Sequence, residues 1–396
     1  DSPSLLFLFK HTFVHILLMI TSLTISTQYA IGCYTSIFSF GDSLADTGNL
    51  LHFSHSAQPQ LPHFGLPPYG ETYFHRPTGR CSDGRLITDF IAQYLGLPFV
   101  SPYFGGSNGS QAADYGGGVN FAVVGATALD DAFFEQRGIH NPYTNISLGT
   151  QLSWFKDMLP SLCLTTSSNC NTLLQSSLVL MGEIGGNDYN HAFLTGRSME
   201  EIQSFVPPVI NAIASAINEL IKLGAVKLMV PGNLPIGCSV AYLTYFESSN
   251  KEDYDPTTGC LVWLNKFAEY HNDQLQIKLN RIRELHPHAT IIYADYYNAA
   301  MRLYRSPSKF GFTRGALTAC CGEGGLYNFN SSVQCGYPPS SACDDPSLYV
   351  NWDGLHLTEA AYRWISKGLL EGPYTIPRIN TSCVAVAVNA KYSMTT

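Results

Sequence analysis

Charged residues are scarce in this 396-residue chain. Asp, Glu, Lys and Arg together make up 13% of the sequence, which is about half the share usual in globular proteins. The 30 acidic residues outnumber the 22 Lys and Arg residues, so the formal net charge is −8. Nucleic-acid binding relies on a basic surface that attracts phosphates. The composition therefore argues against a nucleic-acid partner.

Long apolar runs are missing from the chain after the N-terminal region. No segment there reaches the 18 apolar residues typical of a membrane span. One apolar stretch, residues 13–25, follows the basic residue Lys10 but is interrupted by Thr and Ser. Ala30 and Gly32 are small residues suited to a signal-peptidase site. The pattern predicts a signal peptide over residues 1–32, with an uncleaved anchor as the alternative. We expect a secreted protein, extracellular or in a vacuole or another secretory compartment, without stable membrane insertion.

The sequence contains no Cys-x2-Cys pair, so a zinc site is disfavoured and no metal or cofactor is expected. It has 11 cysteines, which fits an oxidising compartment and leaves at least one thiol unpaired. Cys163 and Cys170 close a short polar loop and are a predicted disulfide. Four more cysteines lie in a Gly/Pro-rich stretch and are predicted to staple a loop: Cys320, Cys321, Cys335 and Cys343.

Four Asn-x-Ser/Thr sequons suit a secreted glycoprotein, although such triplets also arise by chance. They are Asn108, Asn145, Asn330 and Asn380.

Apolar, β-rich runs alternate with helical patterns along the chain. The predicted strands cover residues 35–40, 119–123, 177–183, 226–230 and 290–293, and the predicted helices cover residues 84–95, 209–223, 261–285 and 358–370. Such alternation is typical of an α/β protein whose parallel sheet is covered on both faces. We find no linker, repeat or charge run, so we expect one domain over residues 33–380 and a tail over 381–396.

A serine follows the first predicted strand in the sequence Gly41-Asp42-Ser43. In α/β proteins functional residues collect at the carboxyl ends of strands. A serine there can act as a nucleophile if a base removes its proton, a third group orients that base, and donors bind the oxyanion.

His356 is the predicted base among 12 histidines. Asp353 precedes it by three residues, so its carboxylate can meet the imidazole Nδ1 and leave Nε2 free for the serine. The alternative is a plain turn at a helix start, with Thr358 as the cap.

Oxyanion donors are predicted after two other strands. Gly125 follows the run 119–123, and a glycine lets its backbone N–H approach a ligand closely. Asn187 follows the run 177–183 and offers a side-chain amide. Ordinary strand-to-helix turns are the alternative at both positions.

Four blocks, in this order along the chain, resemble the GDSL esterase/lipase family of SGNH hydrolases. They are Gly41-Asp42-Ser43-Leu44, the block 118–122 with Gly125, Gly185-x-Asn187-Asp188 and Asp353-x-x-His356. Residues 68–72 and 76–80 resemble its large plant branch.

The resemblance implies a flavodoxin-like three-layer α/β/α sandwich with a mainly parallel, five-stranded sheet. It also implies roles: Ser43 is nucleophile and backbone donor, Gly125 and Asn187 complete the oxyanion hole, His356 is the general base and Asp353 orients it. One departure is Leu357, where the family often has proline after the histidine.

Ser107 is a rival nucleophile, because Gly105-Gly106-Ser107-Asn108-Gly109 matches the Gly-x-Ser-x-Gly elbow of α/β-hydrolases. That elbow needs a strand before it and a helix after it, and the sequence favours neither.

The predicted activity is hydrolysis of carboxylic esters of small soluble plant metabolites. We expect the protein to be a monomer. An acyltransferase using the same acyl-enzyme, a lipase acting on acyl lipids, and a non-enzymatic glycoprotein are the alternatives. Many aromatic residues in long loops could stack on a substrate or pack onto the core.

Overall fold

The computed structural model describes residues 34–57, 61–107, 115, 117–165 and 170–379. The predicted signal peptide, the predicted tail, and the sequons at Asn108 and Asn380 lie outside the described residues.

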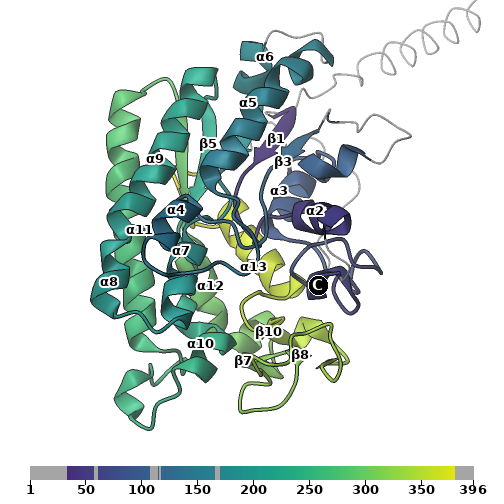
Figure 1. Ribbon diagram of the computed structural model, residues 1–396, viewed down its shortest axis with the longest axis vertical. Helices are drawn as coiled ribbons and strands as arrows, with labels where there is room; N and C mark the ends of the chain where they lie inside the picture. The colour runs from purple at the N-terminus through teal and green to yellow at the C-terminus, as the bar shows by residue number, and fades with distance from the viewer. Residues whose placement is uncertain (1–33, 58–60, 108–114, 116, 166–169, 380–396) are drawn as a thin grey trace, which may run out of the picture. The chain divides into compact units, whose positions relative to one another are not determined.

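A seven-stranded sheet forms the centre of the fold, in the order β11-β6-β5-β4-β1-β3-β2 (Figure 1). Its five inner strands are parallel and correspond to the five predicted strands: β1 (Ser36–Ser39), β3 (Gly118–Asn120), β4 (Ser177–Leu180), β5 (Lys227–Pro231) and β6 (Thr290–Ala294). The mainly parallel α/β fold is therefore confirmed. Two edge strands, β2 (Ser101–Pro102) and the antiparallel β11 (Thr375–Ile376), were not predicted, because two-residue strands carry no hydrophobic period.

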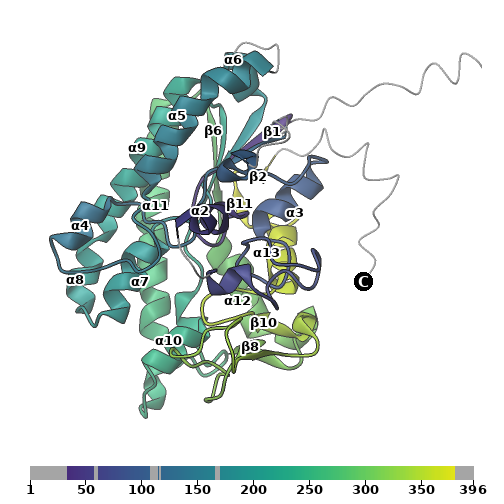
Figure 2. The same ribbon diagram turned by 45° about the vertical axis from the view of Figure 1, so that its right-hand side comes forward.

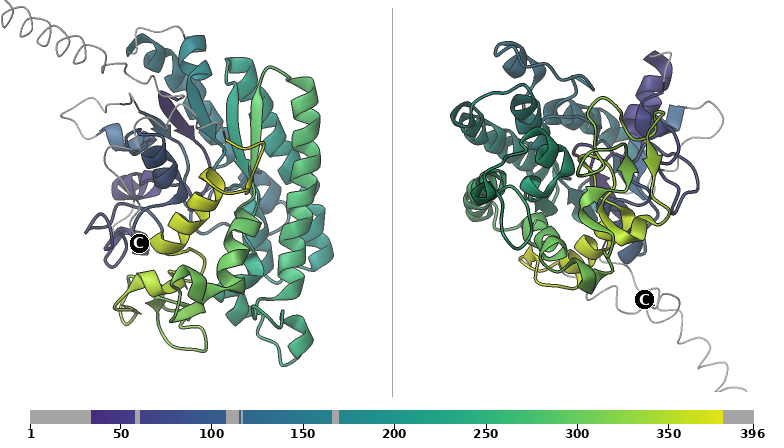
Figure 3. Two further views of the ribbon diagram at one scale, coloured as in Figure 1. Left: turned by 180° about the vertical axis from the view of Figure 1, so that it is seen from behind. Right: turned by 90° about the horizontal axis from the view of Figure 1, so that it is seen from below.

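Both faces of the sheet are covered, which explains why its strands are almost entirely buried. One group of long helices packs together on one face: α5 (Leu148–Thr165), α9 (Val206–Leu223) and α11 (Val262–Leu285). The other face carries α3 (Ile87–Tyr94), α12 (Tyr296–Arg305) and α13 (Glu359–Leu370), as the view from behind shows (Figure 3).

The predicted helix boundaries are close to the observed ones. Gly224 ends α9 in the left-handed conformation (φ 117°), and Thr358 caps α13 by accepting a hydrogen bond from the backbone N–H of Ala361. The helix α3 begins three residues later than predicted. The Asp89 carboxylate accepts from the backbone N–H of Leu86 and pairs with Arg80, and these bonds fix the helix start.

Shorter elements complete the described fold. The remaining helices are α2 (Asn49–Ala57), α4 (Asp131–Glu135), α6 (Cys170–Gln175), α7 (Gly186–Leu194), α8 (Met199–Ser204) and α10 (Val240–Tyr245); two small sheets pair β7 (Gly315–Ala319) with β10 (Tyr349–Asn351) and β8 (Cys321–Gly322) with β9 (Ser341–Ala342). Single 3-10 turns are η1 (His63–Gly65), η2 (Tyr103–Ser107), η3 (Ile236–Cys238), η4 (Lys251–Asp253), η5 (Pro307–Phe310) and η6 (Pro346–Leu348). The loop region with β7 to β10 lies beside α10 (Figure 2).

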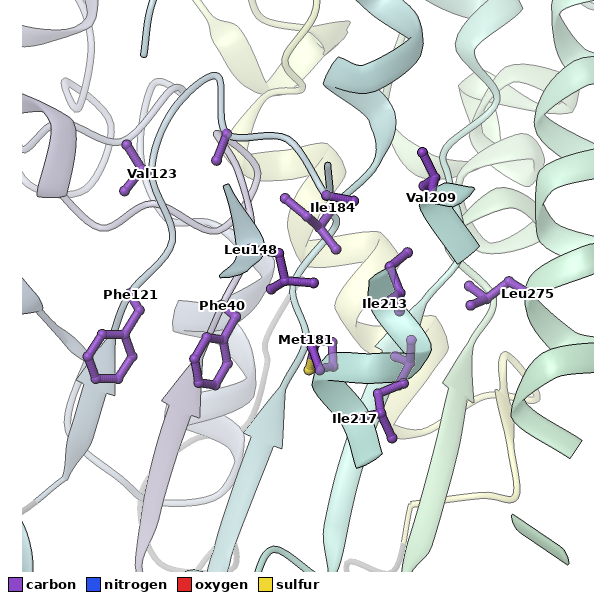
Figure 4. Packing of buried hydrophobic residues seen from close by; sticks show 14 of the residues in the cluster. Phe40, Phe121, Val123, Leu148, Met181, Ile184, Val209, Ile213, Ile217 and Leu275 are labelled. Carbon is purple, nitrogen blue, oxygen red and sulfur yellow. The ribbon is translucent and has the colours of Figure 1, made fainter. Parts of the chain in front are cut away.

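Aromatic and aliphatic side chains fill the space between the sheet and the α5–α9–α11 face (Figure 4). The rings of Phe40 and Phe121 stack at 5.4 Å, and Phe155 of α5 meets Phe40 edge to face at 5.6 Å. Phe40 and Phe121 directly follow β1 and β3. The core therefore fixes the ends of the two strands from which the site loops leave.

Four disulfides join described cysteines, and they confirm the predicted Cys163–Cys170 pair. The stapled loop is also confirmed, with Cys320 bonded to Cys343 and Cys321 to Cys335, so these thiols are not zinc ligands. The pair Cys238–Cys260 was not predicted, and Cys81 is a buried free thiol. No group of potential metal ligands occurs among the residues that the structure describes.

Within the described ranges, one helical segment, Met199–Leu223, is long and apolar enough to cross a membrane by length and composition. It comprises α8 and α9, and 56% of its most apolar window is buried inside the protein, as expected for a core helix.

Candidate active site

The turn after β1 presents Ser43 at the carboxyl end of the sheet. The side chain of Gln151 clamps the turn by donating to the carbonyl of Gly41 (2.8 Å) and accepting from its N–H (2.9 Å). Gly41 has a φ of 147°, and a Cβ there would lie 2.9 Å from the carbonyl oxygen of Glu183. Only glycine fits this position without strain, which explains the glycine before the serine.

Ser43, His356 and Asp353 form one hydrogen-bonded chain, although 313 residues separate the serine from the histidine. The distance from His356 Nε2 to Ser43 Oγ is 2.8 Å, and from His356 Nδ1 to Asp353 Oδ2 it is 2.9 Å. Asp353 Oδ1 also accepts from the backbone N–H groups of Leu355 and His356, each at 2.8 Å. The carboxylate is thus fixed in place, and the imidazole is oriented toward the serine.

Gly125 and Asn187, the predicted oxyanion donors, line the same cavity as Ser43 and His356. Gly125 has a φ of 81°, and a Cβ there would lie 2.7 Å from the Cβ of Tyr143. Asn187 is the second residue of α7, and its Nδ2 donates to the carbonyl of Ala126 at 3.0 Å. Its Oδ1 accepts from Asn190 at 3.3 Å, so the carboxamide is held at both ends.

Two cavities meet at Ser43. The smaller has a volume of about 70 Å³ and the larger about 140 Å³, and Ser43, Asn187, Leu355 and His356 line both. Several aromatic side chains stand in the wall of the larger cavity, and no Lys or Arg occurs among the described residues lining either one. The larger cavity is lined by Phe64, Tyr69, Tyr143, Tyr245 and Phe329, among others. A two-part substrate can therefore place one part on each side of the serine.

Comparison with known proteins decides the family. The family described as GDSL-like Lipase/Acylhydrolase matches residues 37–369. The chain belongs to this family. A GDSL esterase/lipase of Arabidopsis thaliana is 54% identical over 96% of this chain and 94% of its own length. A second Arabidopsis member is 55% identical over 91% of both chains, and the sinapine esterase of Brassica napus is 52% identical over 93% of both.

Membership and these relatives make the protein a carboxylic ester hydrolase, as the sequence predicted. A solved acetyl-xylooligosaccharide esterase from Geobacillus is 13% identical, with a TM-score of 0.32, over 71% of this chain and 82% of the other. A likeness that low carries no argument about substrate.

The structure explains how this family member accommodates Leu357 in place of the frequent proline. The backbone N–H of Leu357 donates to the phenol oxygen of Tyr362 at 3.2 Å. A proline could not make that bond. The histidine-bearing turn is thus tied to α13 by a different contact.

The rival serine, Ser107, ends the 3-10 turn η2, after the two-residue edge strand β2. An α/β-hydrolase elbow places its serine in the turn directly after a strand, whereas Ser107 is the last of five residues in η2.

Two buried carboxylates that sequence reasoning missed connect the site loops. Asp46 accepts from the N–H groups of Gly48, Asn49, Leu50 and Val124, and burial nonetheless raises its pKa to about 6. Asp188 accepts from Ala128 and Leu129, tying α7 to the loop after β3, and burial raises its pKa to about 7. Asp46 closely follows the first motif and Asp188 is part of the third, so the motifs themselves were the available signal.

The electrostatics of the hydrogen-bonded chain from Ser43 to Asp353 suit His356 as a base. Burial lowers the pKa of His356, but the charge and hydrogen bond of Asp353 raise it more, so the net pKa lies above 6.5. Burial raises the pKa of Asp353, yet the His356 charge and several hydrogen bonds outweigh burial and hold it below its usual range. Asp353 is therefore ionised at every pH at which His356 titrates.

Tyr69 is a further neighbour of Asp353 that sequence reasoning did not assign. Its hydroxyl donates to Asp353 Oδ2 at 2.8 Å, and its ring meets the Trp352 ring edge to face at 5.7 Å. Tyr69 is fully buried. The carboxylate therefore shares its Oδ2 between the histidine and the phenol.

We expect Tyr69→Phe to shift the acid limb of kcat/KM to higher pH by about half a unit, because Asp353 then directs its full charge to His356. We expect kcat/KM on the plateau to fall about threefold to tenfold, the scale of a typical net hydrogen-bond contribution. A pH profile of kcat/KM for both proteins measures this. If Tyr69 only packed against its neighbours, Tyr69→Phe would lower the thermal stability of the protein without shifting the acid limb of kcat/KM.

Proposed function

We propose that the esterase reaction proceeds through an acyl-enzyme on Ser43. The observation that carries the proposal is the unbroken chain from Ser43 Oγ through His356 to Asp353, with links of 2.8 and 2.9 Å. Chains with this geometry activate a serine in unrelated hydrolases.

In the first half-reaction Ser43 Oγ attacks the ester carbonyl carbon while His356 Nε2 takes the hydroxyl proton. The carbonyl oxygen becomes an oxyanion bound by the Ser43 and Gly125 N–H groups and by Asn187 Nδ2. His356 then returns the proton to the leaving alcohol as the carbon–oxygen bond breaks. In the second half-reaction water attacks the acyl-enzyme by the same path, releasing the acid and restoring Ser43.

Asn187→Ala tests the oxyanion role. We expect kcat to fall by about 10²–10³-fold with a small change in KM, because the lost amide acts chiefly in the transition state. Steady-state kinetics measure both parameters. Asn280→Ala, at an exposed asparagine of α11 outside both cavities, is the matched control and should keep the wild-type kcat. A tenfold or smaller loss in Asn187→Ala would contradict the assignment.

The substrates we propose are small soluble esters of plant metabolites. The two cavities at Ser43 have volumes of about 70 and 140 Å³, and aromatic side chains in the wall of the larger one are suited to stacking on a flat group. The name of the sinapine esterase relative points to the same class. A panel of esters with varied acyl and alcohol parts, compared by kcat/KM, tests this, and preference for long-chain acyl lipids would overturn it.

The same assay separates hydrolysis from acyl transfer. Each ester is incubated with and without alcohol acceptors, and free acid is measured against new ester. We expect free acid to dominate in both conditions. New ester as the main product would identify an acyltransferase with the same acyl-enzyme.

We further propose a monomeric secreted glycoprotein of one domain. Four disulfides support an oxidising compartment, and the sequon residues Asn145 and Asn330 are exposed. Expression in plant cells tests this. The proposal requires that the mature protein is found in the secretory pathway and that its mass falls after glycosidase treatment. It also requires that its mass in solution, measured by light scattering, matches one chain.

A further inference from the structure

Two carboxyl groups that the mechanism above does not use lie directly behind the proposed oxyanion hole. Asp42 precedes Ser43 and is 2% exposed, and Glu183 follows β4 and is 7% exposed. The backbone N–H of Asp42 donates to the carbonyl of Glu183 at 3.0 Å, which continues the β1–β4 pairing beyond the strands. A hydrogen bond between the two side chains is among the causes that shift the pKa of both groups.

Such a bond between carboxyl groups requires a proton, because two carboxylates only repel. Ionisable groups from several neighbouring elements act on the pair. They are His356, Cys81, Asp188 and Tyr189 of α7, Tyr242 of α10, Tyr296 of α12 and Tyr362 of α13. No Lys or Arg is among the described residues that line the adjoining smaller cavity. A second negative charge on the pair would therefore be poorly compensated.

Burial is the first cause of a raised pKa in both groups. Burial and the Glu183 charge raise the pKa of Asp42 well above its usual range. Burial raises the pKa of Glu183 to about 7, although its hydrogen bond from Asp42 works in the opposite direction. Glu183 therefore ionises first, near neutral pH, and Asp42 holds the last proton of the pair to higher pH.

The pair also contacts the oxyanion amide. Asn187 Nδ2 lies 3.4 Å from Asp42 Oδ2 and 3.0 Å from the carbonyl oxygen of Ala126. An amide has two N–H bonds, so the one near Asp42 must point either to that oxygen or to a substrate oxyanion. A neutral Asp42 competes weakly for this N–H, whereas an ionised Asp42 competes strongly.

We propose that Asp42 and Glu183 are positioning residues that share a proton and thereby leave the Asn187 amide free for the substrate oxyanion. When hydroxide removes the proton as water, the negative charge draws the Asn187 N–H away and repels the developing oxyanion. The inference rests on the proposed function, since it assigns Asn187 to the oxyanion. It adds an alkaline limb to the pH profile, distinct from the acid limb set by His356.

Glu183→Gln tests the proposal, because glutamine keeps the size and hydrogen-bonding capacity of the side chain but cannot ionise. With a neutral ester, we expect wild-type kcat/KM to fall at alkaline pH, where Asp42 loses the last proton of the pair, by up to about tenfold per pH unit. In Glu183→Gln the charge that raises the pKa of Asp42 is gone, so we expect this limb to move down by at least about one pH unit. An unchanged alkaline limb overturns the proposal.

Glu359→Gln is the matched control. Glu359 is also 7% exposed, but it pairs with Arg85 and lines neither cavity. The proposal requires this variant to keep the wild-type alkaline limb. A downward shift of the limb in both variants would indicate a general effect of removing a buried carboxylate and would also overturn the proposal.

Infrared difference spectroscopy between pH 6 and pH 9 separates this inference from the proposed function. We expect wild type to lose carbonyl absorbance of a protonated carboxylic acid as the pH rises, and Glu183→Gln to lose less. This readout needs no turnover. If Ser43→Ala remained active the acyl-enzyme proposal would fail alone, whereas identical infrared titrations would refute the shared proton alone.

Discussion

Replacing Ser43 by Ala is expected to lower kcat by about 10⁶-fold, the scale seen when the serine of a Ser-His-Asp triad is removed. The alanine leaves no oxygen within reach of His356 Nε2, now 2.8 Å from the hydroxyl. The backbone N–H at position 43 and the other oxyanion donors stay in place, so substrate binding should change little. Hydrolysis of a chromogenic ester, followed over hours, measures the residual rate.

Ser107→Ala is the control for this experiment, since it removes the other serine in a glycine-flanked motif. We expect it to keep full activity. An organophosphonate probe should label the wild type and Ser107→Ala but not Ser43→Ala. Normal turnover by Ser43→Ala would refute the nucleophile assignment, and a wild type that is neither labelled nor active would favour a non-enzymatic protein.

The chain of Ser43, His356 and Asp353 could be predicted from the sequence because each residue lies in a short motif at a strand or helix end. Such positions are set by local backbone geometry. Gly41, for example, is required by a close approach to Glu183, and Thr358 caps the helix that follows His356. Local rules and the parallel sheet together bring the motifs to one edge.

Tyr69 and Glu183 were beyond the reach of the same reasoning. Tyr69 lies 284 residues from Asp353, in a loop without periodic structure, and only the folded chain brings the two together. Glu183 was read as the end of a strand, where a lone acidic residue is unremarkable. Its pairing with Asp42 depends on the register of β1 against β4, which no single-sequence pattern specifies.

The edges of the fold show the same limit. The strand β11 follows α13 and pairs antiparallel with β6, and β2 adds two residues beside β3. Both strands are determined by the exposed hydrogen-bonding edges of neighbours that were predicted correctly. Propensity over two residues cannot reveal them, whereas the five inner strands each carry a buried apolar run.

Asp353→Asn is expected to lower kcat by about 10⁴-fold while leaving the protein folded. The asparagine is nearly the same size as aspartate and can still accept from the N–H groups of Leu355 and His356 through its oxygen. Its amide nitrogen would then face His356 Nδ1 and donate to it. That contact favours the tautomer with a proton on Nε2, which cannot accept the proton of Ser43.

The pH profile separates this tautomer effect from simple loss of structure. In wild type the activity should fall as the pH drops through the pKa of His356, which Asp353 holds above 6.5. In Asp353→Asn the carboxylate charge is gone and burial alone acts on the imidazole, so the acid limb should move below pH 6.5 while the plateau stays about 10⁴-fold lower. Asp344→Asn, at an exposed aspartate outside both cavities, is the matched control and should keep the wild-type profile. An acid limb at the same pH in wild type and Asp353→Asn would mean that Asp353 does not set the basicity of His356, and the orienting role would have to be withdrawn.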